Sequence, residues 1–243
     1  DAGTGDEREI ARNRPLTRPR PGHADLPGML SYDLPEARPV LERASARETA
    51  ARVALGVLAE ALLDQVAGVG LVSHVVSVGG QRATASVLPT PADEAALCEA
   101  SMRALDPADN ARFEAAVDAA KHAGDTIGGV AEVIAYGIPV GLGTHVSARE
   151  RLDARLAAAL MSIQSVKGVE IGDGFAQAAL LGSQAHDEIV HGPDGHLTRT
   201  SNHAGGIEGG TSNGSPIIAR AAFKPISTVP RALRSVDLAT GEE

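Results

Sequence analysis

Residues 45–78 read SARETAARVALGVLAEALLDQVAGVGLVSHVVSV, and this stretch decides the fold class. Its first part opens with a Ser-x-x-Glu capping box and continues in Ala, Leu and Val, which predicts a helix over 45–66. Its second part, 69–78, is rich in β-branched residues and is followed by a Gly-Gly pair, which predicts a strand. A long helix that leads directly into an apolar strand indicates a globular chain with mixed elements.

Further helical and extended segments follow along the chain. Residues 1–40 are rich in Pro, Gly and Arg and predict an ordered loop or a linker. Because helices and strands mix without a regular βαβ rhythm, the fold class is predicted to be α+β. The other predicted elements are helices at 109–122 and 150–163, strands at 128–140, 166–171 and 216–223, a small Ala-rich helix at 174–181, a hairpin with its tip at 193–195, and a Gly-rich loop at 205–214.

Composition argues against several classes of function. A net charge of −9 disfavours non-specific attachment to nucleic acid or to an anionic membrane. The chain has no Trp, two Tyr and three Phe, so aromatic stacking platforms for single-stranded nucleic acid are not expected. No apolar run of about eighteen residues and no signal-peptide pattern occur, which predicts a soluble, cytoplasmic protein. The single cysteine, Cys98, is interpreted as a small buried residue.

Arginine is concentrated in the first part of this acidic chain. Residues 8–52 hold nine arginines, six acidic residues and no lysine. Guanidinium groups grip carboxylates and phosphates through paired hydrogen bonds, so the cluster suits a small polyanion. A solvated face with ordinary salt bridges explains the composition equally well. If the predicted helix extends back to residue 43, Arg43 and Arg47 share a face at its anion-attracting N-terminal end. The nine are Arg8, Arg12, Arg14, Arg18, Arg20, Arg38, Arg43, Arg47 and Arg52.

Two other features have the residue types that chemistry needs. His23 follows Arg20 in a Pro/Gly-stiffened segment, where a histidine beside cations and a phosphate can act as a general acid. The glycines of 205–214 let backbone N–H groups approach a ligand, although a tight hairpin or bulge accounts for them as well. They lack the G-x-G-x-x-G spacing of a dinucleotide-binding loop. The other histidines show no metal-ligand spacing, so no metal is predicted.

Six separated segments carry a family resemblance that runs over almost the whole chain. They are PLTRPRPGHAD (15–25), ERASARET (42–49), DTIGG (125–129), VKGVEIG (166–172), AGGIEGGTSNG (204–214) and KPIST (224–228). In this order they resemble the chorismate synthase family. Six blocks in the right order are more specific than any single short motif.

The resemblance implies an enzyme that binds reduced FMN and converts 5-enolpyruvylshikimate 3-phosphate to chorismate and phosphate by 1,4-elimination. It also implies a homotetramer whose subunits have a β-α-β sandwich fold. His23 would be the catalytic histidine near the flavin, and Arg20 and Arg47 would hold the substrate's phosphate or carboxylates. The FMN site would be lined by Arg43, Ala44, Ser45, Gln164, Ser165, Gly210, Lys224, Pro225, Ile226, Ser227 and Thr228.

The sequence departs from the family pattern at both ends. It lacks the Gly-(Glu/Asp)-Ser-His-Gly motif with a further catalytic histidine, and the Arg-Ser-Asp segment with an acid-base aspartate. Residues 1–243 are therefore expected to form a single chorismate synthase-type domain that is truncated at both ends. An inactive piece that retains only FMN or anion binding is one alternative, and an unrelated phosphate-binding domain is another. Missing strands also predict exposed apolar faces and poor solubility.

Overall fold

The computed structural model describes residues 14–84 and 86–243, which form parts of two compact units. Of the described residues, unit 1 comprises 14–46, Gly124–Thr126 and Ile226–Glu243. Unit 2 comprises Arg47–Ala123 and Ile127–Pro225. The single-domain interpretation of the sequence stays a prediction.

Unit 1 contains two short helices, α2 (Asp25–Ser31) and α3 (Arg38–Arg43), where the sequence predicted an ordered loop or a linker. Gly28 of α2 packs directly against Val40 of α3, so a Cβ at position 28 would overlap the Val40 side chain. The proline at position 39 lies at the start of α3, where its missing N–H is tolerated. The helices are too short for a clear apolar period, which explains why the sequence did not reveal them.

The last segment of the chain, 226–243, lies beside residues 17–20 within unit 1. The Thr17 hydroxyl donates to Asp237 Oδ2 at 2.9 Å, and the backbone N–H of Leu238 donates to the Thr17 carbonyl at 3.0 Å. The Ser235 hydroxyl donates to the carbonyl of Pro19. These bonds join segments more than 200 positions apart in the sequence.

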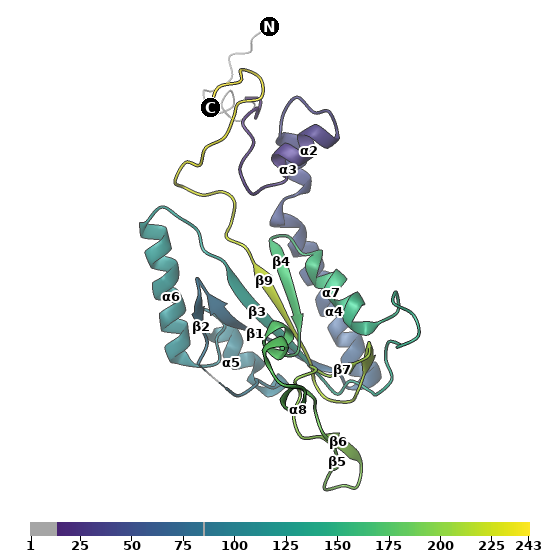
Figure 1. The fold of residues 1–243 in the computed structure, drawn as a ribbon. Helices are drawn as coiled ribbons and strands as arrows, with labels where there is room; N and C mark the ends of the chain where they lie inside the picture. Colours follow the sequence, from purple (N-terminus) through teal and green to yellow (C-terminus); the bar gives the residue numbers. More distant parts are fainter. Residues whose placement is uncertain (1–13, 85) are drawn as a thin grey trace. The chain divides into compact units, whose positions relative to one another are not determined.

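Unit 2 is built on a five-stranded antiparallel sheet with strand order β2-β1-β3-β9-β4 (Figure 1). The α+β prediction is confirmed. The strands of unit 2 are β1 (Gly70–Val78), β2 (Gln81–Arg82), β3 (Gly129–Tyr136), β4 (Val166–Ile171), β5 (Ile189–His191), β6 (Leu197–Arg199), β7 (Ile207–Glu208), β8 (Thr211–Ser212) and β9 (Ile217–Phe223). Its helices are α4 (Thr49–Ala67), α5 (Glu94–Glu99), α6 (Pro107–His122), α7 (Leu152–Met161) and α8 (Gly182–Ala185), with 3-10 turns η2 (Pro91–Asp93) and η3 (Gly174–Ala179). A further 3-10 turn, η1 (Ala46–Glu48), begins with the last residue of the first segment of unit 1.

Two apolar clusters pack against the sheet. The first joins Val72, Ile134 and Ile218 from neighbouring strands to Leu97 of α5. The second joins Val78, Ala104 and Phe113, with Phe113 of α6 completely buried. Full burial of such side chains stabilises the sheet by roughly 1.5–3 kcal/mol each.

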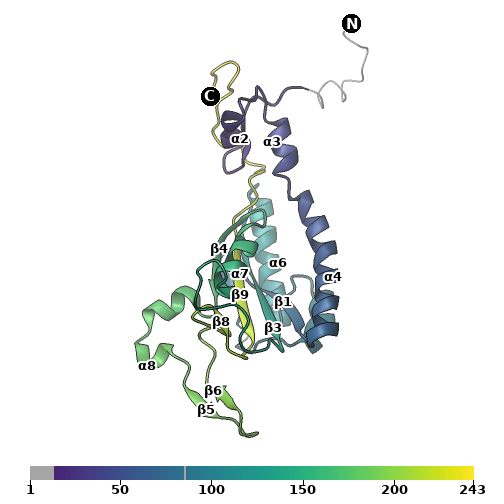
Figure 2. The ribbon, with the colours of Figure 1, turned by 90° about the vertical axis from the view of Figure 1, so that its right-hand side faces the viewer.

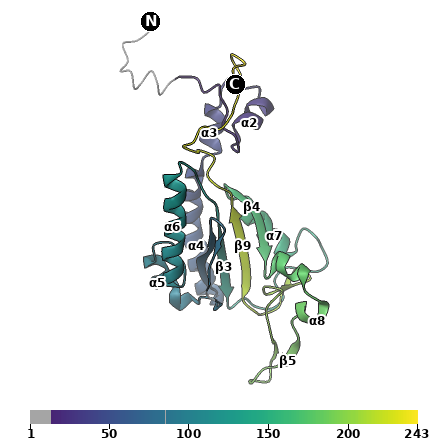
Figure 3. The ribbon, with the colours of Figure 1, turned by 60° about the vertical axis from the view of Figure 1, so that its left-hand side comes forward.

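Helix α4 exposes an unusual amount of apolar surface. Its Val and Leu side chains are between 42% and 76% exposed, and none of its residues is buried. Within unit 2, no element lies on the outer side of α4 in Figure 2. The prediction of exposed apolar faces is confirmed for this helix. The β5–β6 hairpin projects from the sheet (Figure 3), with residues 193–195 at its tip as predicted.

Several boundaries differ from the predictions for local reasons. Helix α4 begins at Thr49 instead of 45, because residues 46–48 form a 3-10 turn, and its N-cap Glu48 makes no side-chain capping bond. Strand β3 ends at Tyr136, because Gly137 takes a left-handed φ of +76°. The helix expected over 174–181 is a 3-10 turn, η3, which ends at Ala179 because Leu180 and Leu181 are extended; α8 begins only at Gly182.

Two further observations concern surface and membrane. Cys98 is exposed, so its interpretation as a buried residue was wrong. Helix α5 turns Leu97 inward and therefore presents the next side chain to solvent. Among the residues that the structure describes, none of the helices has the length and apolar character to cross a bilayer.

Candidate functional site

His23, Arg20 and Asp25 form a hydrogen-bonded cluster in unit 1. Asp25 is the first residue of α2 and is only 2% exposed. Arg20 donates to Asp25 through Nε at 2.8 Å, through Nη2 at 3.2 Å and through its backbone N–H at 3.1 Å. His23 Nδ1 lies 2.5 Å from Asp25 Oδ1. The carboxylate thus holds both predicted site residues in fixed orientations.

The charge of Asp25 determines which ring nitrogen of His23 carries the proton. Burial would raise the pKa of Asp25, but hydrogen bonds from Arg20 and the nearby charges of His23 and Arg20 outweigh it and lower the pKa. An ionised carboxylate only accepts hydrogen bonds, so the short contact places a proton on His23 Nδ1. Nε2 is then the nitrogen that can exchange a proton with a ligand.

The predicted segment Ile226–Thr228 lies beside this cluster within unit 1. Arg20 Nη1 donates to the Thr228 hydroxyl at 3.0 Å, and the Thr126 hydroxyl donates to the Ile226 carbonyl at 2.8 Å. A cavity of about 220 Å³ opens here. It is lined by Arg18, Pro19, Arg20, Pro21, Ser227, Thr228, Val229, Leu233 and Ser235. Guanidinium and hydroxyl donors therefore converge on one small hollow.

A second group of predicted residues meets in unit 2, where β4 begins and β9 ends. The Lys224 backbone N–H donates to the Ser165 carbonyl at 2.9 Å, and Pro225 follows directly. Ser165 has a left-handed φ of +72°, an uncommon conformation for a residue with a side chain. Gln164 donates through Nε2 to Glu48, at the start of α4.

Gln164 also has unused bonding capacity. Its Oε1 atom is buried and accepts no hydrogen bond from any residue that the structure describes. A buried polar atom without a partner costs free energy, so it marks a position where a bound group with an N–H or O–H donor fits. Reduced FMN has such donors on its ring. Ser165, whose backbone has the uncommon left-handed conformation, is the next residue in the chain. The residues present fit the cofactor that the resemblance implies.

Arg43 and Arg47 do not share a helical face, so that interpretation was wrong. Helix α3 ends at Arg43, Ala44 is its C-cap, and Arg47 belongs to the 3-10 turn that precedes α4. Both arginines are exposed, whereas Ala44 and Ser45 are half-buried. Of the nine clustered arginines, Arg8 and Arg12 lie outside the described residues.

Gly210 lies away from the other predicted residues of unit 2. It precedes β8 at the Ile217 end of β9, whereas Lys224 follows the other end. The seven residues of β9 separate these ends by about 20 Å. The structure gives Gly210 a packing role: its φ is +84°, and a Cβ there would lie 2.6 Å from Arg151 Cγ.

The sequence analysis missed three residues that organise these regions. Asp25 lies two residues after His23, a short-range signal that could have been noticed. Asp187 accepts from the backbone N–H groups of His203 and Ala204 and so holds the start of the Gly-rich loop. Glu132 is buried against His74 and Arg220, far apart in the sequence. Within residues 14–84 and 86–243, no group of three or more His, Cys, Asp or Glu side chains has a metal-binding arrangement.

Comparison with known proteins gives one consistent family. A family model described as chorismate synthase matches residues 5–243. The chorismate synthase of Nocardia farcinica is 61% identical over 235 residues, which are 97% of this chain and 58% of that protein. The chorismate synthase of Bifidobacterium animalis subsp. lactis is 60% identical over 233 residues, which are 95% of this chain and 59% of that protein.

A solved structure agrees with these relatives. A crystal structure of chorismate synthase matches with a TM-score of 0.78 and 42% sequence identity, over 85% of this chain and 64% of that one. The chain thus spans about three fifths of the length of the relatives that it matches. Because the family model covers nearly all of the sequence and the relatives are about 60% identical, the chain belongs to the chorismate synthase family.

Proposed function

We propose that the protein takes part in the elimination of phosphate from 5-enolpyruvylshikimate 3-phosphate, with reduced FMN as cofactor. The observation that carries this proposal is the Arg20–Asp25–His23 cluster, in which one buried carboxylate orients a cation and an imidazole. A substrate with a phosphate and two carboxylates requires fixed cations. Arginine provides them with paired donors and no proton loss.

Each residue of the cluster has a separate task in the proposed reaction. Asp25 keeps a proton on His23 Nδ1, so Nε2 can give or take a proton at the cofactor or substrate. Arg20, which also bonds the Thr228 hydroxyl, stabilises negative charge on the departing phosphate. Reduced FMN, when bound, supplies electron density while phosphate leaves. Placement and charge stabilisation are then the protein's contribution.

The unit 2 group is proposed to contribute to cofactor binding. Gln164 Oε1 would accept a hydrogen bond from the flavin, and the Ser165–Lys224 backbone bond fixes the surrounding turn. The assignments of Arg43, Ala44, Ser45, Pro225, Ile226 and Ser227 to the FMN site, and of Arg47 to the substrate, are part of the proposal. Gly210 remains assigned to the FMN site in this proposal, because it belongs to the segment 204–214 that carries the family resemblance. A homotetramer in the cytoplasm is proposed for the complete assembly.

A binding role without turnover is the second candidate. The observation behind it is the uncovered apolar side of α4. A surface of this kind is ordinarily covered in a folded protein.

One experiment separates the two functions. The chain is titrated with FMN, and chorismate formation is then followed under anaerobic conditions with photoreduced FMN and the substrate. Turnover supports the proposed reaction, and FMN binding without chorismate supports the binding role. Absence of both turnover and FMN binding refutes both.

Gln164→Ala tests the cofactor site, because the proposal expects weaker FMN binding, with exposed Gln184→Ala as the control.

A further inference from the structure

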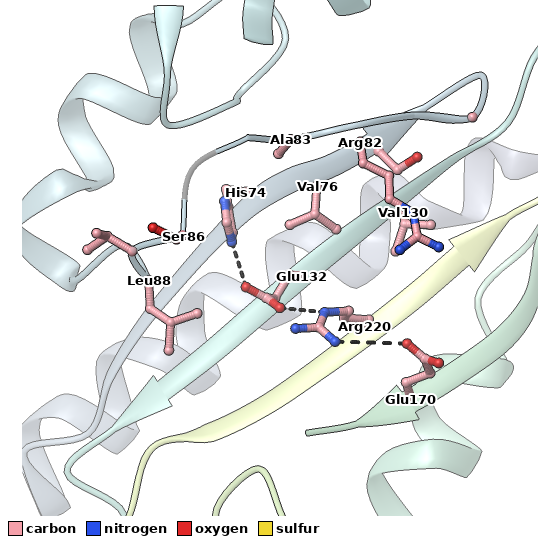
Figure 4. A pocket seen from close by; sticks show the side chains of 13 residues that line it. His74, Val76, Arg82, Ala83, Ser86, Leu88, Val130, Glu132, Glu170 and Arg220 are labelled. Carbon is pink, nitrogen blue, oxygen red and sulfur yellow. Dashed lines mark hydrogen bonds and ion pairs between the residues drawn. The ribbon is translucent and has the colours of Figure 1, made fainter. Parts of the chain in front are cut away.

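Four titratable side chains lie in register across neighbouring strands of the unit 2 sheet. His74 of β1 pairs with Glu132 of β3, Glu132 with Arg220 of β9, and Arg220 with Glu170 of β4. Residues in register point to the same face of a sheet, and Figure 4 shows the four side chains along one line. We call these four residues the charge ladder.

Bonds inside the charge ladder neutralise its central carboxylate. His74 Nε2 lies 2.7 Å from Glu132 Oε1, and Arg220 Nε donates to Glu132 Oε2 at 2.6 Å. Glu132 is 2% exposed. Burial would raise the pKa of Glu132, but the hydrogen bond from His74 and the charge of Arg220 outweigh it and lower the pKa. Each oxygen of the Glu132 carboxylate thus already has a hydrogen-bond partner, His74 or Arg220.

A cavity of about 600 Å³ lies over the charge ladder, within the range of small-molecule sites. Part of its lining is apolar, from Val76, Leu88 and Val130. Figure 4 shows these side chains around the ladder. The cavity thus combines an apolar lining with charged groups on one face.

Hydrogen-bond donors remain available in this cavity. The guanidinium of Arg82 makes no hydrogen bond or ion pair with any residue that the structure describes. Arg220 uses Nε for Glu132 and Nη1 for the Gly172 carbonyl at 3.1 Å, while Glu170 Oε2 is 3.9 Å from Nη1. Nη2 of Arg220 has no partner among the described residues.

We propose that this cavity binds a small organic carboxylate with an apolar body. The carboxylate accepts from the Arg82 guanidinium, the positive charge of Arg220 lies in the same cavity, and the apolar body lies against Val76 and Val130. Because His74 and Arg220 compensate Glu132, the buried carboxylate does not repel the ligand strongly. Arginine donors with their planar fork are suited to a carboxylate. This site is independent of the proposed elimination reaction and uses none of its residues.

Benzoate serves as the probe. It is titrated into the full chain, and its binding is followed by NMR through the chemical shifts of the β3 and β9 amides. Binding should shift these amides, and neutral benzamide should bind more weakly. Arg82→Gln should weaken benzoate about tenfold or more, because a charge-assisted bond is lost. The control Arg155→Gln removes an exposed arginine of α7 and should leave the affinity unchanged. Val130→Phe fills the cavity and should abolish the shifts.

The proposal is overturned by any of three results. The first is the absence of shifts at β3 and β9 up to the solubility limit of benzoate, and the second is benzamide binding as tight as benzoate binding. The third is inorganic phosphate binding as tight as benzoate binding, which would show an adventitious ion only, without recognition of an apolar body. A thermal melt of each variant confirms folding, and because the Arg82 side chain has no partner among the described residues, its replacement should leave the melt unchanged.

Discussion

Replacement of Asp25 by Asn tests whether this carboxylate holds the unit 1 cluster together. Asp25 is 2% exposed and accepts from Arg20 three times and from His23 once. Removing one partner of a buried ion pair costs about 3–5 kcal/mol. The Arg20 side chain is 30% exposed and can regain water, so the lower end, about 3 kcal/mol, is expected.

Hydrogen exchange of α2 amides is the assay, because it reports opening of unit 1 separately from unit 2. The N–H groups of Gly28 and Tyr32 donate to the carbonyls of Ala24 and Gly28, so their exchange follows local opening of α2. A loss of about 3 kcal/mol makes this exchange about 100-fold faster at pH 7. Amides of β3 in unit 2 should exchange at an unchanged rate.

The effect of Asp25 should also depend on pH. The pKa of Asp25 is lowered by Arg20 and His23 in the folded chain, so its stabilisation is present above the unfolded pKa of about 3.9 and is lost as pH falls through the folded value. The variant and the unaltered chain should therefore converge in acid. Equal exchange rates at pH 7, or a difference that persists in strong acid, would refute the reasoning.

Three other perturbations follow from the described packing and charges. Phe113→Ala empties a fully buried position and should lower the free energy of unfolding by about 3–5 kcal/mol; an unchanged urea midpoint would contradict this. The hydrogen bond to Asp173 raises the pKa of His203, so this pair stabilises the fold at low pH and loses its effect as pH rises through the folded pKa. In Asp173→Asn the NMR titration of His203 should move toward about 6.5, and an unmoved titration would show another cause. The exposed side chains of α4 should bind the dye ANS, and Leu58→Glu should reduce the fluorescence; no binding would show that this surface is covered.

Longer helices could be predicted from the sequence, and the short helices could not. Helices α4, α6 and α7 were recognised because their helical composition persists over several turns, and strands β1 and β4 because β-branched residues mark even a short strand. Helices α2 and α3 were missed because six or seven residues show no reliable period. Gly137 ended β3 earlier than expected through a backbone conformation that composition does not reveal.

The identity of several candidate site residues could be predicted from the family motifs. The contacts that hold those residues in place could not. Arg20 and His23 lie in a recognisable segment, whereas the role of Asp25 follows only from its burial and its bonds to both. The charge ladder joins residues on four strands, and strand order and register are not encoded in local patterns. Glu132 in particular looks like any strand residue until its partners are known.

The most direct test of the account compares phosphate release by the unaltered chain and by His23→Ala, under anaerobic conditions with reduced FMN and 5-enolpyruvylshikimate 3-phosphate. If His23, oriented by Asp25, transfers a proton in the reaction, the variant should release phosphate about 100-fold more slowly or slower still. Equal rates for the two proteins, or no release by the unaltered chain, would contradict the account.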